Sequence, residues 1–178
     1  GNPAVTRCES MSKKFDLNIE EILENWEVFH AIREIIANAM DEELLTQTKE
    51  IEIFCDEGNK WHIRDFGRGI KYEHFTQNEN IEKLENPNVI GKFGIGLKDA
   101  IATFDRNNVN VLIKSRYGDI TFDKSEKHDF DDVITLHAII EPPSESEFIG
   151  TEIILEGCSQ QDINDAKNLF LRFSDDEI

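Results

Sequence analysis

The spacing of apolar residues changes several times along the chain, and each change predicts a different element. Between Ile19 and Leu45 apolar residues recur every three or four positions, which predicts helix, either one helix or two that meet near Asn25. Two short β-prone runs follow, at Ile51–Cys55 and Trp61–Asp65. Because the turn-forming residues Asp56–Asn59 separate them, these runs predict a hairpin.

The second half of the chain predicts further strands and two more helices. Residues Phe66 to Gly96 show little periodicity and predict a long loop, and loops of that length are usually functional or disordered. The elements predicted after this loop are a helix from about Gly96 to Phe104, strands at Val109–Ser115, Ile120–Phe122, Val133–Ile140 and Thr151–Leu155, and a closing amphipathic helix at Asp162–Phe173. Together they predict an α+β two-layer sandwich, in which a mixed and mostly antiparallel sheet carries its helices on one face.

Composition narrows the class of protein. The chain has 178 residues, of which 39% are hydrophobic and 31% are charged, and this is typical of one soluble globular domain. We expect residues 1–18 to form an N-terminal extension and residues 19–178 to form a domain cut from a longer protein, because the chain opens without methionine. The net charge of −18 would repel a phosphate backbone, so we expect no direct nucleic-acid binding through this segment.

The cysteines and the apolar stretches bear on location. Cys8, Cys55 and Cys158 are odd in number and lack the spacings of a zinc site, which favours a reducing cytoplasm. Charged residues interrupt every apolar stretch before it reaches the roughly 18 residues that a membrane span requires. The amino terminus also lacks the pattern of a signal peptide. We therefore expect a cytoplasmic protein with no membrane partner.

Three polar residues of the first predicted helix are candidates for chemistry. Glu34, Asn38 and Asp41 stand at positions i, i+4 and i+7, which places them on one helical face. An asparagine oxygen is a neutral, hard ligand for Mg²⁺, and a nearby glutamate can orient or deprotonate the water that attacks a phosphoryl group. From the helix alone, a solvated stripe with local salt bridges is the commoner interpretation of such a pattern.

Three glycine-containing segments follow, and each is weak evidence by itself. Asp65-Phe66-Gly67-Arg68-Gly69 ends a predicted strand, where a carboxylate can accept a hydrogen bond from an exocyclic amine. Gly91-Lys92-Phe93-Gly94-Ile95-Gly96-Leu97-Lys98 opens a predicted helix, where backbone N–H groups can bind phosphates, but it lacks the spacing of a P-loop. Gly150-Thr151 enters a late strand.

Taken in order, these four motifs resemble the boxes of the GHKL, or Bergerat-fold, ATPases over roughly Phe29 to Leu155. That superfamily includes gyrase B subunits, ninety-kilodalton heat-shock chaperones, MutL, MORC proteins and histidine-kinase catalytic domains. The resemblance implies that Glu34 is the general base, that Asn38 binds Mg²⁺, and that Asp65 binds the adenine amino group, with Thr151 acting through a bridging water. The nucleotide-binding residues that it implies are Asn38, Asp65, Gly67, Gly69, Ile70, Asn78, Gly91, Gly94, Gly96, Leu97, Lys98 and Thr151.

The resemblance also implies roles for further residues. Gly67 and Gly69 would form the turn that faces adenine, Ile70 an apolar wall for the base, and the segment from Lys71 to Ile95 a lid closed by ATP. Asp41 would support the site structurally, and either Lys92 or Lys98 could contact a phosphate. His30 lies on the same helix, and we interpret it as structural rather than as a phosphate acceptor.

The function that follows is Mg²⁺-dependent ATP hydrolysis that drives a conformational switch in a larger protein. We expect a downstream transducer domain or a partner protein to take part, together with ATP-dependent dimerisation of the full-length protein, and slow turnover in the isolated domain. A non-hydrolysing ATP-gated interaction module and a protein-histidine kinase domain are the alternatives. Sensor kinases typically lack a glutamate at the position of Glu34, so its presence favours the hydrolases.

Overall fold

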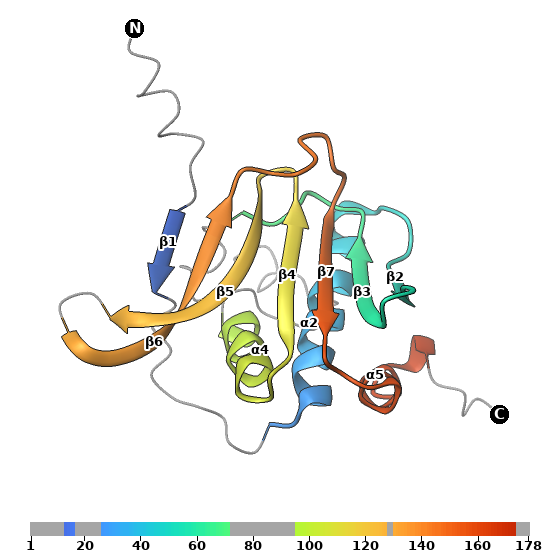
Figure 1. The fold of residues 1–178 in the computed structure, drawn as a ribbon. Coiled ribbons are helices and arrows are strands. Elements are labelled where there is room, and N and C mark those ends of the chain that lie inside the picture. Colours follow the sequence, from blue (N-terminus) through green and yellow to red (C-terminus); the bar gives the residue numbers. More distant parts are fainter. Residues whose placement is uncertain (1–12, 17–25, 72–94, 128–129, 174–178) are drawn as a thin grey trace, which may run out of the picture.

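The structure, a computed structural model, describes residues 13–16, 26–71, 95–127 and 130–173 (Figure 1). Its described strands form one seven-stranded sheet in the order β1-β6-β5-β4-β7-β3-β2. Every pairing between neighbouring described strands is antiparallel. The strands are β1 (Lys13–Asp16), β2 (Glu52–Cys55), β3 (Lys60–Asp65), β4 (Asn110–Ser115), β5 (Gly118–Lys127), β6 (Phe130–Glu141) and β7 (Thr151–Glu156).

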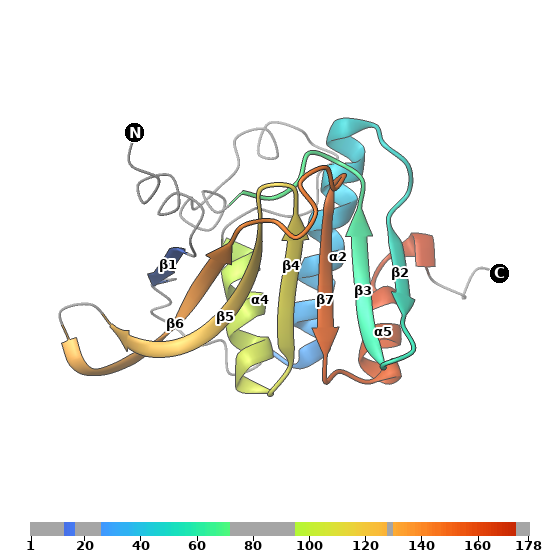
Figure 2. The same ribbon diagram turned by 45° about the horizontal axis from the view of Figure 1, so that its top comes forward.

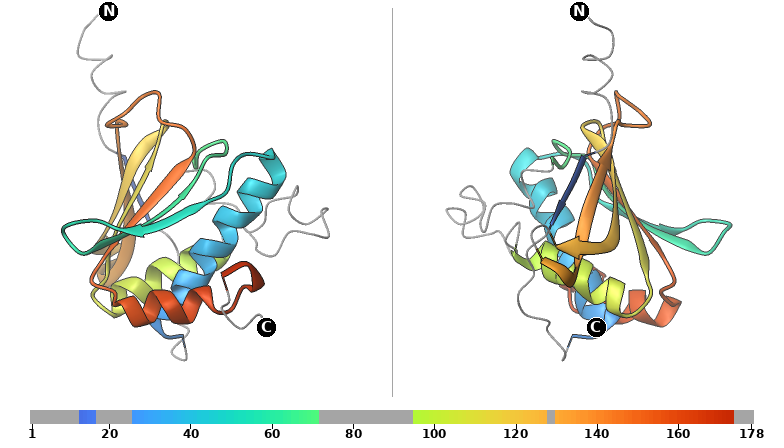
Figure 3. Two further views of the ribbon diagram at one scale, coloured as in Figure 1. Left: turned by 90° about the vertical axis from the view of Figure 1, so that its right-hand side faces the viewer. Right: turned by 60° about the vertical axis from the view of Figure 1, so that its left-hand side comes forward.

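The helices cover one face of this sheet, which confirms the predicted α+β sandwich (Figure 2 and Figure 3). They are α2 (Val28–Thr46), α4 (Ile95–Arg106) and α5 (Gln160–Lys167), followed by a short 3-10 turn, η2 (Leu171–Phe173). Helix α2 packs against both α4 and α5 and also against β3. Among the described residues, no helix combines the length and the apolar character needed to cross a membrane.

Helix α2 forms where the three- and four-residue periodicity predicts it. At its start, the backbone N–H of Glu27 donates to Nδ1 of His30 at 2.9 Å, so His30 has the structural role expected of it. At its end, Gln47 adopts a left-handed conformation with φ of 53°, and its N–H donates to the backbone oxygen of Glu43. The part of the predicted helix between residues 19 and 25 lies outside the described residues.

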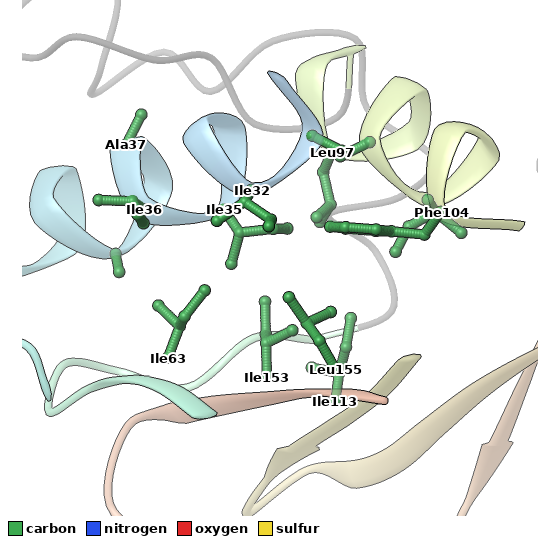
Figure 4. Close-up of a cluster of buried hydrophobic side chains, with 14 of the residues drawn as sticks. Ile32, Ile35, Ile36, Ala37, Ile63, Leu97, Phe104, Ile113, Ile153 and Leu155 are labelled. Carbon is green, nitrogen blue, oxygen red and sulfur yellow. The ribbon is translucent and has the colours of Figure 1, made fainter. Parts of the chain in front are cut away.

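The core lies between the helices and the inner face of the sheet. Figure 4 shows that α2 and α4 direct branched and aromatic side chains toward residues of β3, β4 and β7. The labelled members from the helices are Ile32, Ile35, Ile36, Ala37, Leu97 and Phe104, and those from the strands are Ile63, Ile113, Ile153 and Leu155. Because one whole side of α2 is buried in this core, the helix cannot rotate without breaking the packing.

The hairpin was predicted correctly. β2 and β3 pair in register from Glu52↔Arg64 to Cys55↔Trp61. In the turn, Oδ1 of Asp56 accepts the N–H groups of Gly58 at 2.8 Å and Lys60 at 3.0 Å.

Several boundaries differ from prediction, and one strand was not predicted. The closing helix stops at Lys167 instead of reaching Phe173, because the chain tightens into i+3 turns that bury the ring of Phe170. The strand predicted at 120–122 extends over Gly118–Lys127, since it pairs along its length with β6. Within the expected N-terminal extension, Lys13–Asp16 forms the edge strand β1.

Candidate functional site

A cavity of about 460 Å³ lies between α2 and the ends of β3 and β7. Its wall brings together residues from five separate parts of the chain, in the ranges 35–42, 63–71, 97, 116–117 and 147–153. Seven residues that the sequence predicted to bind nucleotide line it, namely Asn38, Asp65, Gly67, Gly69, Ile70, Leu97 and Thr151. A cavity of this size, whose wall combines apolar side chains with polar and charged ones, is suited to a small organic ligand that carries polar groups.

One end of the cavity is a buried carboxylate held by backbone donors. The pairing of β3 with β7 sets Asp65 opposite Thr151, and both residues are buried. Oδ1 of Asp65 accepts the N–H of Gly67 at 2.9 Å and the N–H of Thr151 at 3.3 Å. These bonds fix the plane of the carboxylate, so it can act as an oriented acceptor for an amine.

The glycine of the Gly150-Thr151 pair is required by this geometry. Gly150 has φ of +80°, and a Cβ at this position would overlap the backbone oxygen of Asp65. Any other residue would therefore push β7 away from β3 at the point where Thr151 and Asp65 meet.

An ion pair that the sequence motifs did not predict borders the same cavity. Glu42 is buried, and its Oε2 accepts the backbone N–H and the Nε–H of Arg68, each at 2.9 Å, while its Oε1 accepts from Nη2 at 3.0 Å. A Cβ at Gly67 would overlap the Glu42 side chain. The absence of a side chain at Gly67 therefore makes room for Glu42, in addition to any contact with a ligand. The spacing held a signal for this pair, because Glu42 stands four residues after Asn38 on the same helical face.

The polar face of α2 is not a solvated stripe. Asn38 and Asp41 are 7% and 1% exposed, and the side chain of Glu34 is 15% exposed. Burial raises the pKa of Glu34, although Arg33, whose Nη1 donates to Oε1 of Glu34 at 2.9 Å, opposes the shift. The nearby carboxylates of Asp99 and Asp41 raise this pKa further. A partly buried carboxylate whose pKa is raised next to a cavity is a candidate catalytic base.

The first turn of helix α4 lies against the side chain of Glu34. A Cβ at Gly96 would overlap Oε2 of Glu34 and would lie 3.1 Å from its Cδ. The carboxylate of Glu34 therefore touches the backbone at the start of α4, where unpaired N–H groups favour anions. Neither Glu34 nor Gly96 belongs to the cavity wall itself.

The remaining predicted residues fall into two groups. Leu97 is buried in the core below the cavity, so it contributes an apolar wall. Lys98 follows it on α4, does not line the cavity, and stays a prediction as a phosphate contact. Four predicted residues lie outside the described part of the chain: Asn78, Gly91, Lys92 and Gly94.

Four further residues that the sequence did not single out line the cavity mouth: Arg116, Tyr117, Phe148 and Ile149. Tyr117 is held on two sides by cations, with Nζ of Lys71 4.5 Å and the guanidinium carbon of Arg116 4.9 Å from its ring centre. These residues come from turns, and no motif marked them.

Comparison with known proteins agrees with this geometry. The model of the protein family described as "Histidine kinase-, DNA gyrase B-, and HSP90-like ATPase" matches residues 26–147, which is more than half of the chain. The chain therefore belongs to this family of ATP-binding domains, as the ordered motifs predicted.

A relative is found in Mycoplasma pneumoniae. The chain is 42% identical over 159 residues to a protein of that bacterium described as "Uncharacterized protein". The similar region covers 88% of this chain and 64% of the relative, so the chain spans less than two thirds of that protein.

Proposed function

We propose that this domain hydrolyses ATP in a Mg²⁺-dependent reaction and acts as a nucleotide-driven switch within a larger protein. Membership of the family supports ATP binding. The observation that supports hydrolysis is the partly buried carboxylate of Glu34, which has a raised pKa and touches the start of α4 at Gly96.

The adenine base would occupy the end of the cavity at Asp65. The carboxylate accepts an N–H from the exocyclic amine, and Ile70, which is 4% exposed, supplies the apolar wall. Guanine carries a carbonyl at the same ring position, so it would present an acceptor to an acceptor. The site should therefore prefer ATP to GTP.

The residues of α2 fit a Mg²⁺ ion. Asn38 would hold it through its amide oxygen, with the carboxylates of Glu34 and Asp41 nearby. Within the described residues no three His, Cys, Asp or Glu side chains form a metal site of their own, and Mg²⁺ is usually bound by one or two protein groups together with substrate phosphates. When bound, the ion would neutralise charge on the phosphate oxygens.

The hydrolytic step would depend on Glu34. Its carboxylate accepts a hydrogen bond from a water molecule and orients it in line with the γ-phosphorus. The water oxygen bonds to phosphorus while the bond from phosphorus to the bridging oxygen breaks, and ADP and inorganic phosphate leave. The water proton passes to Glu34 and then to solvent. The raised pKa brings this base closer to neutral pH, where it can both accept and release the proton.

The test compares three variants for ATP affinity and phosphate release. Glu34→Gln should retain ATP affinity and lose about two to four decades of turnover. Asp65→Asn should lose affinity, because an oriented acceptor becomes partly a donor. Glu43→Gln is the matched control on the same helix, since Glu43 pairs with Arg172 and does not line the cavity. Wild-type turnover in Glu34→Gln would refute hydrolysis by this base.

The same assays separate the alternative functions. ATP binding without any phosphate release from the wild-type chain would favour a non-hydrolysing module. Transfer of phosphate to an added histidine-containing domain would favour a kinase.

The switch and the partners are also part of the proposal. We infer that ATP changes the exchange of backbone amides in the domain and that a transducer domain or partner protein reads this change. ATP-dependent dimerisation would belong to the full-length protein. The isolated domain should then turn over slowly, and a longer chain carrying the partner region should be faster by about two to three decades. Equal rates in both would refute the need for that region.

A further inference from the structure

We propose that Ser115 is a positioning residue of the nucleotide site. It lies at the end of β4 and, through two hydrogen bonds in series, sets the apolar wall at Ile70 and the hydroxyl of Thr151. This proposal rests on the proposed function, because it takes a nucleotide as the ligand of the cavity.

The first step is the contact of Ser115 with Ile70. Ser115 is 1% exposed, and its Oγ donates to the backbone oxygen of Ile70 at 2.8 Å. The same Oγ accepts the N–H of Tyr117 at 3.1 Å. The Tyr117 N–H therefore fixes the serine hydroxyl in the orientation that donates to Ile70.

The second step is the contact of Ile70 with Thr151. The N–H of Ile70 donates to Oγ1 of Thr151 at 2.9 Å. The main chain of Ile70 is thus held on both sides by buried hydroxyls, one from β4 and one from β7. This matters because the preceding residue, Gly69, has φ of +90° and no side chain, so it does little by itself to restrict the backbone of Ile70.

The third step concerns the direction of the Thr151 hydroxyl. Oγ1 of Thr151 accepts a hydrogen bond from the N–H of Ile70, so its own O–H must point elsewhere. Thr151 lines the cavity beside Asp65, and its N–H already donates to Oδ1 of that carboxylate. Ser115 therefore orients both the wall and the polar end of the base pocket without lining the cavity itself.

The segment that contains Ile70 lies against the turn that joins β4 and β5. A Cβ at Gly69 would lie 3.6 Å from Cβ of Ser115 and 3.6 Å from Cε2 of Tyr117. Nζ of Lys71, one residue after Ile70, lies over the Tyr117 ring. The segment from Gly69 to Lys71 is therefore seated on the β4–β5 turn, and Ser115 is the hydroxyl that joins the two.

The test uses Ser115→Ala, Ser115→Thr and the control Thr103→Val. Thr103 is also 1% exposed, and its Oγ1 donates to the backbone oxygen of Asp99 at 2.8 Å, within its own helix. Ser115→Ala should raise the Kd for both ATP and ADP about fivefold to tenfold and reduce the preference for ATP over GTP. It should leave kcat at saturating ATP close to that of the wild type, because Glu34 lies on a different element. Ser115→Thr keeps the hydroxyl and should stay close to wild type.

A second measurement needs no nucleotide. Ser115→Ala should speed hydrogen exchange of the Ile70 amide by about tenfold, and Thr103→Val should not change it. If Ser115→Ala does not fold, Ser115→Cys replaces the strong donor with a weak one on a somewhat larger side chain, and it takes the same place in the comparison.

The outcomes separate the two proposals. Unchanged Kd together with unchanged Ile70 exchange would overturn the role of Ser115, and so would an equal rise of Kd in Thr103→Val. Wild-type protein that bound no ATP would refute the proposed function, while the exchange rate of the Ile70 amide would still decide whether Ser115 holds that segment in place.

Discussion

The contact between Gly96 and Glu34 gives a direct way to displace the proposed base without removing it. In Gly96→Ala the new Cβ would overlap Oε2 of Glu34 and lie 3.1 Å from its Cδ and 3.7 Å from its Cγ. The clash falls on the far end of a flexible side chain that is 15% exposed, so Glu34 can rotate away. The fold should accommodate the change, and the carboxylate should be displaced.

The expected magnitude follows from that displacement. Oε2 must retreat by about 1 Å to reach an ordinary contact with the new methyl group, and a misplacement of that size can cost about a hundredfold in rate. A hundredfold loss corresponds to about 2.7 kcal/mol of transition-state stabilisation. Alanine is a better helix former than glycine, so the free energy of unfolding should stay unchanged or rise by up to about 1 kcal/mol.

The assay is a double-mutant cycle with Glu34→Ala. Phosphate release at saturating ATP, ATP affinity by calorimetry and thermal unfolding would be measured for wild type, both single variants and the double variant. If Gly96→Ala acts through the base, the double variant should be no slower than Glu34→Ala alone. Independent, multiplying effects would show that the methyl group obstructs phosphate instead, and this result would refute the reasoning.

Three further predictions concern the pH response of Glu34 and two ion pairs, Arg68 with Glu42 and His62 with Asp56. Because burial raises the pKa of Glu34, turnover should fall with decreasing pH through a midpoint above 4.5, as a pH-rate profile can check. For the same reason the charged form of Glu34 destabilises the fold, so Glu34→Gln should be more stable than wild type at neutral pH, as urea unfolding can check. Arg68→Ala should lower the free energy of unfolding in urea by about 3 to 5 kcal/mol, because it leaves the buried carboxylate of Glu42 without its guanidinium partner. Glu42→Gln should lower it less, because the Arg68 side chain is 46% exposed and water can solvate it. The hydrogen bond from His62 lowers the pKa of Asp56 below its ordinary value of 3.8. The stability that this bond adds is therefore present above pH 3.8 and is lost as the pH falls and Asp56 is protonated. His62→Gln should therefore lower the melting temperature more at about pH 6 than at about pH 2, as calorimetry can measure.

Local patterns predicted the elements whose stability is local. The helix around Asn38 and the hairpin at Asp56–Asn59 each carry their periodicity and turn chemistry within a few residues. The strand β1 could not be predicted in this way, because four residues at a sheet edge form a strand only when β6 is there to pair with them. The closing helix was predicted too long, since its apolar spacing continues to Phe170, where burial is reached through a tighter turn.

The candidate site, like the fold, could be predicted from the sequence only in part. Order and spacing marked Glu34, Asn38 and Asp65, because the glycines and polar residues around them form recognisable motifs. Spacing placed Glu42 on the same helical face as Asn38, but it did not predict which residues Glu42 and Ser115 contact. Glu42 meets Arg68 across 26 positions, and Ser115 meets Ile70 across 45 positions, and both contacts depend on how α2 and the strands are arranged in the fold.

If the proposed function holds, the architecture separates nucleotide recognition from hydrolysis. Asp65 and Thr151 stand on neighbouring strands and are held by hydrogen bonds that run to the β4–β5 turn, so changes there should alter which nucleotide binds and how tightly. Glu34 and Asn38 stand on α2, whose opposite side is buried in the core, so the packing of α2 on the sheet sets their position relative to the strands. The two parts meet only through the core and the cavity. Variants of the strand residues at the site should therefore change Kd at constant kcat, and variants of Glu34 should change kcat at constant Kd. A variant that changed both equally would have to act on the packing between α2 and the sheet.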